Sequence, residues 1–371
     1  MACPAEEDIC LAEEGILIDI LSRLPVKSLI RFKCVSKRWH FLISDPRFAM
    51  SHLRRSVEQS LNPDSCRRVL IGTKPLRSVN CDALIEDANA HTAITELEYP
   101  SMVPEHRFRI VGSCNGLVCL LFYHERLTVW NPSTRQSRDL PSPRPVPFDH
   151  MILHGFGYDS VTDDYKVLRG FREKTAGGTY STAVEIISLQ SNSWRRIPDI
   201  DYTTTFSQGT YMNGSIHWLY LHRENAPRIV IVSFNLASEE FQEILSLPDT
   251  EPLVLFEGIG VMGGCLALYI DSKWEIELWV MKDYGIKSSW TKLFNITREV
   301  LPRTFGWWKP VYVTKDWHIL FDAGEMDSFS FSVYDPEKST FKDCGFYADR
   351  QNFESETYIE SLISPYYQRM E

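Results

Sequence analysis

The feature that most constrains the fold of this chain is a repeat of about fifty residues that runs through most of its length. Five turn-forming pairs each precede a short apolar run, and their second residues are Gly116, Asp164, Gly214, Gly264 and Asp316. These positions are spaced by 48, 50, 50 and 52 residues. Asn-Gly, Gly-Gly and Asp-containing pairs favour tight hairpins, because such turns need residues that tolerate positive φ. Each repeat therefore carries a β-hairpin signal.

A second feature keeps the same period. After the apolar run, each repeat continues into a strand, a tight turn and a further strand, as in LTVWNPSTRQSRDLP and FSVYDPEKSTFKD. When four of these turns are aligned, the residue six positions later is Trp194, Phe241 or Phe341 in three repeats and Ser137 in the fourth. An aromatic residue at a matched position is expected where neighbouring sheets pack on one another.

Repeats of this length with several short strands are typical of β-propeller blades of the kelch size class. A weaker copy beginning near Cys66 brings the number to six, so we predict a mainly β chain with a six-bladed kelch-like β-propeller. A ring must close to avoid open strand edges. The β-rich segment Tyr358–Ser364 follows the last copy, and we expect it to complete the first blade. The alternative is a β-sandwich or an irregular stack of sheets.

The segment before the repeats has a different character. Its apolar residues recur at helical spacing and predict one stripe of a first helix: Ile16, Leu17, Ile20, Leu21 and Leu24. Pro25 ends this helix and opens a second, Ser36 is the expected N-cap of a third, and residues 48–53 form one or two further turns after an Asp45-Pro46 turn. So small a module buries too little surface for a strong core, which favours folding against another chain.

Charge changes at the same border. Residues 16–56 carry nine Lys or Arg and two Asp, whereas the whole chain has a net charge of −10. A basic, apolar patch on an acidic protein favours an acidic protein partner. The basic residues lie between apolar ones without a long Lys/Arg run, so we expect no nucleic-acid partner.

The stretch Leu24–Trp39, LPVKSL-x-RFKCVSK-x-W, resembles the F-box, especially its plant form. The resemblance implies a three-helix module that docks on the Skp adaptor subunit of a cullin-based ubiquitin ligase. The family usually opens with Leu-Pro where Ala12 and Glu13 stand here, and Leu11 lies one residue early. The adaptor contacts that we predict are Leu11, Ile16, Ile20, Leu24, Pro25, Leu29, Val35, Trp39 and Leu42.

The repeats carry a second resemblance. GSCNGLVC, LTVWNPSTRQSRDLP, GFGYDSVTDDYKVLRGF and DYGIKSSWTKLF are similar to the type-one F-box-associated domain, which is kelch-related. Within that group the chain resembles the S-locus F-box-like proteins and the F-box proteins that restrain plant immune receptors, which implies an S-locus ribonuclease or an immune receptor as target. The predicted division is a flexible N-terminus (1–11), the F-box module (12–56), a linker (57–65), the propeller with its closing strand (66–364) and a tail (365–371).

Patterns that would indicate catalysis or metal binding are scarce. His150 and His154 have a suitable spacing for a helical metal site, but the Pro-rich segment before them indicates a loop, and no Glu or Cys stands beside them. No GxSxG, P-loop or complete dinucleotide fingerprint occurs. We therefore expect no enzyme activity, no cofactor and no metal. Cys114 and Cys119, which flank the Asn115-Gly116 turn, are expected to be ordinary buried thiols.

Composition also bears on location. No apolar run is long enough for a transmembrane helix, and the acidic start MACPAEEDIC lacks the order of a secretory signal. Nine cysteines form no CxxC pair, which is typical of reduced thiols. We expect a cytoplasmic or nuclear protein without membrane association.

The tryptophans divide into two groups. Those at repeat-matched positions are expected in the core: Trp130, Trp194, Trp218, Trp279, Trp290 and Trp317. Trp307 and Trp308 lie in a connection between two repeats, where we expect an exposed pair. Interfaces favour Trp as an anchor, so we predict these two as contacts to a target protein.

Two functions remain open from the sequence. In the first, the chain is a non-catalytic receptor that holds a target protein near the ligase and so raises its effective concentration at the conjugating enzyme. In the second, the propeller binds or processes a small molecule or glycan, and the helices are a structural cap. The second requires polar residues that converge on the central channel, and the sequence shows no such cluster, which favours the first.

Overall fold

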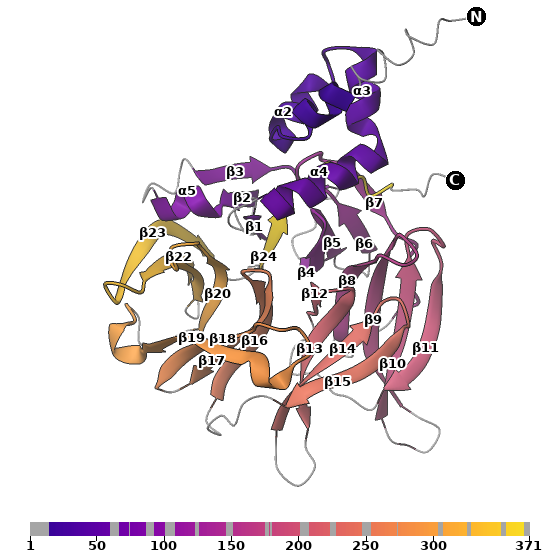
Figure 1. The fold of residues 1–371 in the computed structure, drawn as a ribbon. Helices are drawn as coiled ribbons and strands as arrows, with labels where there is room; N and C mark the ends of the chain where they lie inside the picture. The colour runs from indigo at the N-terminus through magenta and orange to yellow at the C-terminus, as the bar shows by residue number, and fades with distance from the viewer. Residues whose placement is uncertain are drawn as a thin grey trace, which may run out of the picture.

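Six four-stranded antiparallel sheets form a ring, and a group of short helices stands on one side of it (Figure 1). The computed structural model describes residues 15–59, 67–73, 75–86, 93–100, 108–122, 126–145, 151–174, 178, 180–200, 208–222, 228–246, 254–272, 274–302, 307–324, 328–349 and 354–366. The prediction of a mainly β, six-bladed propeller preceded by a helical module is confirmed.

Five blades use four consecutive strands each, and the first blade takes one strand from the end of the chain. In order, the blades are β24 (Ser355–Ile359), β1 (Arg67–Ile71), β2 (Leu76–Asn80) and β3 (Ile94–Leu97); β4 (Phe108–Cys114), β5 (Leu117–Phe122), β6 (Arg126–Trp130) and β7 (Ser137–Asp139); β8 (Met151–Asp159), β9 (Asp164–Lys174), β10 (Tyr180–Ser188) and β11 (Trp194–Ile200); β12 (Thr210–Met212), β13 (Ser215–His222), β14 (Arg228–Asn235) and β15 (Glu240–Ser246); β16 (Val254–Met262), β17 (Cys265–Ser272), β18 (Glu275–Met281) and β19 (Trp290–Thr297); β20 (Trp307–Val313), β21 (Ile319–Gly324), β22 (Ser328–Asp335) and β23 (Thr340–Asp349). The first strands β24, β4, β8, β12, β16 and β20 contact their neighbours around the ring axis.

The turn pairs found in the sequence connect the first and second strands of the blades. Asn115, Asp163, Asn213 and Gly263 have φ of 53, 55, 49 and 56°, in the left-handed region that these residue types tolerate. In the sixth blade the left-handed residue is Trp317, with φ of 66°, rather than Lys315 or Asp316. The sequence repeat therefore begins at the second strand of each blade.

The ring is closed by the C-terminal strand, as predicted. β24 pairs antiparallel with β1, and the hydroxyl groups of Tyr358 and Ser78 lie 2.7 Å apart within this blade. The pairing begins at Ser355, three residues before the predicted segment. The residues after β24 run against the second blade, where the Asn131 side-chain amide donates to the carbonyl of Ile363 at 2.7 Å.

Aromatic side chains fill the space between the sheets, as the matched positions indicated. Phe241 packs against a cluster of buried residues from the third and fourth blades, and Phe341 packs against a cluster from the fifth and sixth blades. The prediction of a core position is wrong for Trp317, whose side chain is half exposed. Its place at the tip of a turn, which the repeat alignment did not reveal, carries it out of the sheet.

The N-terminal module contains a helix at residues 15–21, α2 (Val26–Phe32), α3 (Lys37–Ser44) and α4 (Pro46–Gln59), and a further helix, α5 (Cys81–Glu86), lies in the first blade. Ser36 caps α3 as predicted, since its hydroxyl accepts from the backbone N–H of Trp39 at 3.1 Å. α4 is longer than the one or two turns expected after Asp45. Among the described helices, none combines the length and apolarity needed to cross a membrane.

Two local predictions concern possible chemistry. His154 lies buried on strand β8, so the loop that we predicted there is wrong, and His150 lies outside the described residues. Within the described ranges, no three His, Cys, Asp or Glu residues lie close enough to hold a metal ion. Cys114 and Cys119 are buried thiols, as expected, and burial raises the pKa of both.

Candidate protein-interaction surfaces

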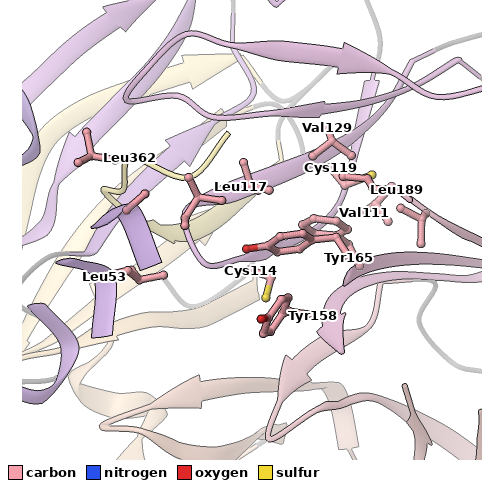
Figure 2. Close-up of a cluster of buried hydrophobic side chains, with 14 of the residues drawn as sticks. Leu53, Val111, Cys114, Leu117, Cys119, Val129, Tyr158, Tyr165, Leu189 and Leu362 are labelled. Atoms are coloured by element: carbon pink, nitrogen blue, oxygen red, sulfur yellow. The ribbon is translucent and has the colours of Figure 1, made fainter. Parts of the chain in front are cut away.

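The inner side of the helical module is part of the same hydrophobic core as the ring. Its buried residues are Leu21, Val26, Leu29, Ile43, Phe48, Ala49 and Leu53. They share one cluster with Leu117 of β5 and with Leu362 and Ile363 after β24. Figure 2 shows Leu53 of α4 in this cluster together with Leu117 and Leu362. Because this core is shared, the module packs on the ring at β5 and at the segment after β24.

Polar contacts hold the helices of the module to one another. Arg55 of α4 donates to Asp19 at 2.7 Å and to the Ser22 hydroxyl at 2.6 Å, and His52 bonds the carbonyl of Leu24 at 2.8 Å. Hydrogen bonds from Arg55 and Arg23 lower the pKa of Asp19. Burial lowers the pKa of His52, which favours its neutral form. These contacts fix the first helix against α4.

The outer side of the module leaves large apolar side chains in solvent. Ile16 and Ile20 are 62% and 53% exposed on one face of the first helix, Val35 is 60% exposed before α3, and Phe41 on α3 is 75% exposed. A module that buries seven residues on one side and exposes these on the other has an apolar surface available for a partner. We call Ile16, Ile20, Val35 and Phe41 the outer apolar residues.

The predicted adaptor contacts fall into three groups in the structure. Four of them are exposed, as a contact requires: Ile16, Ile20, Val35 and Pro25. Three are half-buried and pack against the shared core: Leu24, Trp39 and Leu42. Leu29 is fully buried in the core shared with the ring, so its prediction as a contact is wrong. Leu11 lies outside the described residues. The sequence missed Phe41, although an aromatic on the polar side of α3 was a visible signal.

The predicted target contact at Trp308 is also wrong. Trp308 lies on β20 and is 1% exposed, and its ring meets Phe321 edge-on at 6.0 Å. The connection ends earlier than the sequence suggested, because β20 already begins at Trp307. The side chain of Trp307 lies outside the described part of the structure.

Two other tryptophans are exposed, and they lie on opposite rims of the ring. Trp274, 68% exposed, stands in the turn between β17 and β18, the second and third strands of the fifth blade. Trp317, 51% exposed, stands between the first and second strands of the sixth blade. Since strands in a blade alternate in direction, these two turns lie at opposite ends of the sheets. Asn115 and Asn131, in turns beside the helical module, belong to the same rim as Trp317.

A polar cluster lines the central channel, which encloses a cavity of about 370 Å³. Glu356 of β24 accepts from Gln208 at 2.7 Å and from the Ser113 hydroxyl at 3.3 Å. Burial raises the pKa of Glu354, which accepts from a backbone N–H of β4, to about 7, while the nearby Lys309 opposes this shift. The sequence did not reveal this cluster, because its members come from strands of different blades. Their mutual contacts connect the blades at the axis.

The helical module and the ring each match a known protein family. Residues 11–50 match the F-box domain, and residues 73–364 match the F-box associated beta propeller domain. The chain is an F-box protein with an F-box associated propeller. The F-box protein CPR1 of Arabidopsis thaliana is 31% identical over 94% of this chain and 87% of its own length. F-box protein At3g07870 of the same plant is 31% identical over 90% of this chain and 87% of its length.

Among solved structures, TolB from Acinetobacter baumannii aligns with a TM-score of 0.46 and 10% identity, covering 84% of this chain and 71% of TolB. That likeness is too low to support an argument. The F-box of this F-box protein implies a Skp-type adaptor as partner, and the propeller implies a protein target held by the ring. F-box substrate receptors are in general non-catalytic.

Proposed function

We propose that this F-box protein is a substrate receptor of a Skp–cullin–F-box ubiquitin ligase. The helical module binds the adaptor, and the propeller holds a protein that is ubiquitinated and degraded. The observation that supports this best is the two-sided module: its inner side packs on the ring, while Ile16, Ile20 and Phe41 remain in solvent. Covering these side chains with an adaptor removes apolar surface from water, which drives association.

The small-molecule alternative is less well supported. The channel does contain polar groups, but Gln208 and Ser113 already donate to Glu356, and the cations Lys309 and Arg67 lie near the acidic residues. These contacts join β24 to other blades and account for the cluster as part of ring closure.

Substitution of Phe41 tests the adaptor contact. Phe41→Asp should strongly reduce co-purification with a Skp adaptor and cullin, because it places a charge within an apolar interface. Val161→Asp is the matched control: Val161 is also 75% exposed, but it lies in the turn between β8 and β9 of the ring. Equal recovery of the adaptor by both variants and the original chain would contradict the proposal.

We assign the target to the rim that carries Trp274. The helical module occupies part of the other rim, so a target on the free rim meets no obstruction from the adaptor. Exposed Trp is a favoured interface anchor. Trp274→Ala should reduce ubiquitination of the target in cells whose proteasome is blocked, whereas Trp317→Ala, on the module's rim, should not. An immune receptor and an S-locus ribonuclease are the two targets to assay directly. The opposite pattern of losses would place the target on the module's rim.

A further inference from the structure

A cavity of about 270 Å³ lies where the helical module meets the ring, separate from the central channel. On the module side it is lined by Lys27 and Arg31 of α2. On the ring side it is lined by Arg68 of β1 and by Arg135 in the turn between β6 and β7. Four cationic residues from two parts of the protein therefore surround one space.

Few acidic groups offset this charge. Among the described lining residues the one carboxylate is Glu360, whose Oε1 lies 3.5 Å from Nη1 of Arg68. Outside the lining, Glu98 lies 3.7 Å from Arg135, and both side chains are largely exposed. The cations exceed the nearby carboxylates by two, and like charges brought together in this way repel one another unless an anion joins them.

Ser133 gives an independent indication. It lines the same cavity, and its Oγ is buried without a hydrogen-bond partner among the described residues. The Asn131 side chain accepts from the backbone N–H of Ser133 at 2.8 Å and so holds the residue in place. Ser133 is half-buried, and a buried hydroxyl without a partner is costly. Rotation of this side chain toward the cavity would let a ligand oxygen accept its proton.

We propose that this cavity binds a small, soluble phosphate-bearing molecule. Arg guanidinium groups offer paired N–H donors that match phosphate oxygens, and Lys adds a compact charge. The volume is slightly below the ~300–1,000 Å³ usual for ligand sites, which suits a small molecule. The ligand bridges Lys27 and Arg31 of the module to Arg68 and Arg135 of the ring, and so stabilises the junction. This site is independent of the ligase function proposed above.

Pyrophosphate is the probe for the first test, titrated calorimetrically into the full chain. Saturable binding at millimolar concentration or below is expected, with at least tenfold weaker affinity for Lys27→Gln with Arg31→Gln. The matched control is Lys37→Gln with Arg38→Gln, two exposed cations on α3, which should change the affinity less than twofold. Absence of saturable binding, or equal losses in the two double variants, would overturn the proposal.

Ser133→Ala provides a test that does not alter charge. Removing a hydroxyl that has no partner should leave the melting temperature unchanged or raise it in the absence of pyrophosphate. The same variant should bind pyrophosphate at least threefold more weakly. Unchanged affinity would show that the hydroxyl does not meet the ligand and would contradict the geometry proposed.

A vesicle assay distinguishes a soluble phosphate from a lipid headgroup. The chain should stay in the supernatant when vesicles containing a phosphoinositide bisphosphate are sedimented. Co-sedimentation that Lys27→Gln with Arg31→Gln abolishes would overturn the assignment of a soluble ligand.

Discussion

Truncation of the first helix's exposed face gives the sharpest quantitative test of adaptor binding. Ile16 and Ile20 are 62% and 53% exposed in the isolated chain. Full burial of an Ile side chain contributes about 1.5–3 kcal/mol, so covering the remaining half or more of each contributes about 1–1.5 kcal/mol. For the double variant Ile16→Ala with Ile20→Ala, we expect the free energy of adaptor binding to weaken by about 2–3 kcal/mol. This corresponds to a Kd that is roughly 30- to 150-fold higher.

The assay is calorimetric titration of the purified chain with a Skp adaptor. Neither residue contributes to the buried core, so the melting temperature of the double variant should stay within a degree or two of the original, also because Ala favours helix. Val161→Ala is the control for loss of an exposed aliphatic side chain elsewhere, and it should leave the Kd unchanged. A change in Kd of less than threefold for the double variant would refute the reasoning.

Three further predictions concern the ring, each followed by thermal or denaturant unfolding. Trp308→Ala should lower the free energy of unfolding by about 3–5 kcal/mol, whereas Trp274→Ala should change it by no more than about 0.5 kcal/mol. Equal losses of stability in the two variants would contradict the burial of Trp308 and the exposure of Trp274. Deletion from Ser355 onward should lower the melting temperature markedly, because β1 loses its partner strand and becomes an open edge; an unchanged melting temperature would show that β24 does not hold the ring closed. The pKa of Glu354 in the folded state is about 7, above its ordinary value of 4.5, so the folded state binds this proton more tightly than the unfolded state does. The original chain therefore loses stability as pH rises from 4.5 through 7. The stability of Glu354→Gln relative to the original chain should therefore increase by about 1–3 kcal/mol between pH 5 and pH 8; a pH-independent difference would refute this.

The blades could be predicted because their signals are local and periodic. Turn residues such as Asn115, Asp163 and Asn213 need left-handed backbone, and each stands at the same place in its blade. Ring closure followed because a sheet edge must be covered. The one turn that broke the pattern, at Trp317, has its left-handed residue shifted beyond the expected pair, and the repeat alignment therefore assigned its side chain to the core.

The interaction surfaces were only partly predictable, because exposure depends on which elements meet in space. Leu29 and Ile16 both belong to apolar helical patterns, but Leu29 lies in the core shared with the ring, whereas Ile16 lies on the exposed face of the first helix. Nothing in the sequence spacing distinguishes these two cases. Likewise, Trp308 was assigned to a connection between two repeats, because the repeat signal begins at the second strand of each blade and leaves the first strand, here β20, unmarked. The polar cluster around Glu356 joins residues far apart in the sequence, so periodicity could not reveal it.

The shared core has a consequence for how the two parts act together. A flexible tether between the module and the ring would let the target sample many positions, and its effective concentration at the conjugating enzyme would fall. Here Leu53 packs with Leu117 and Leu362 in one cluster, and Asn131 holds the segment after β24 against the same blade. With the adaptor on the outer apolar residues and the target on the rim of Trp274, as proposed above, this shared core would limit changes in their separation and orientation. Loosening this core should lower ubiquitination without weakening the binding of either partner, which separates the role of the junction from that of each surface.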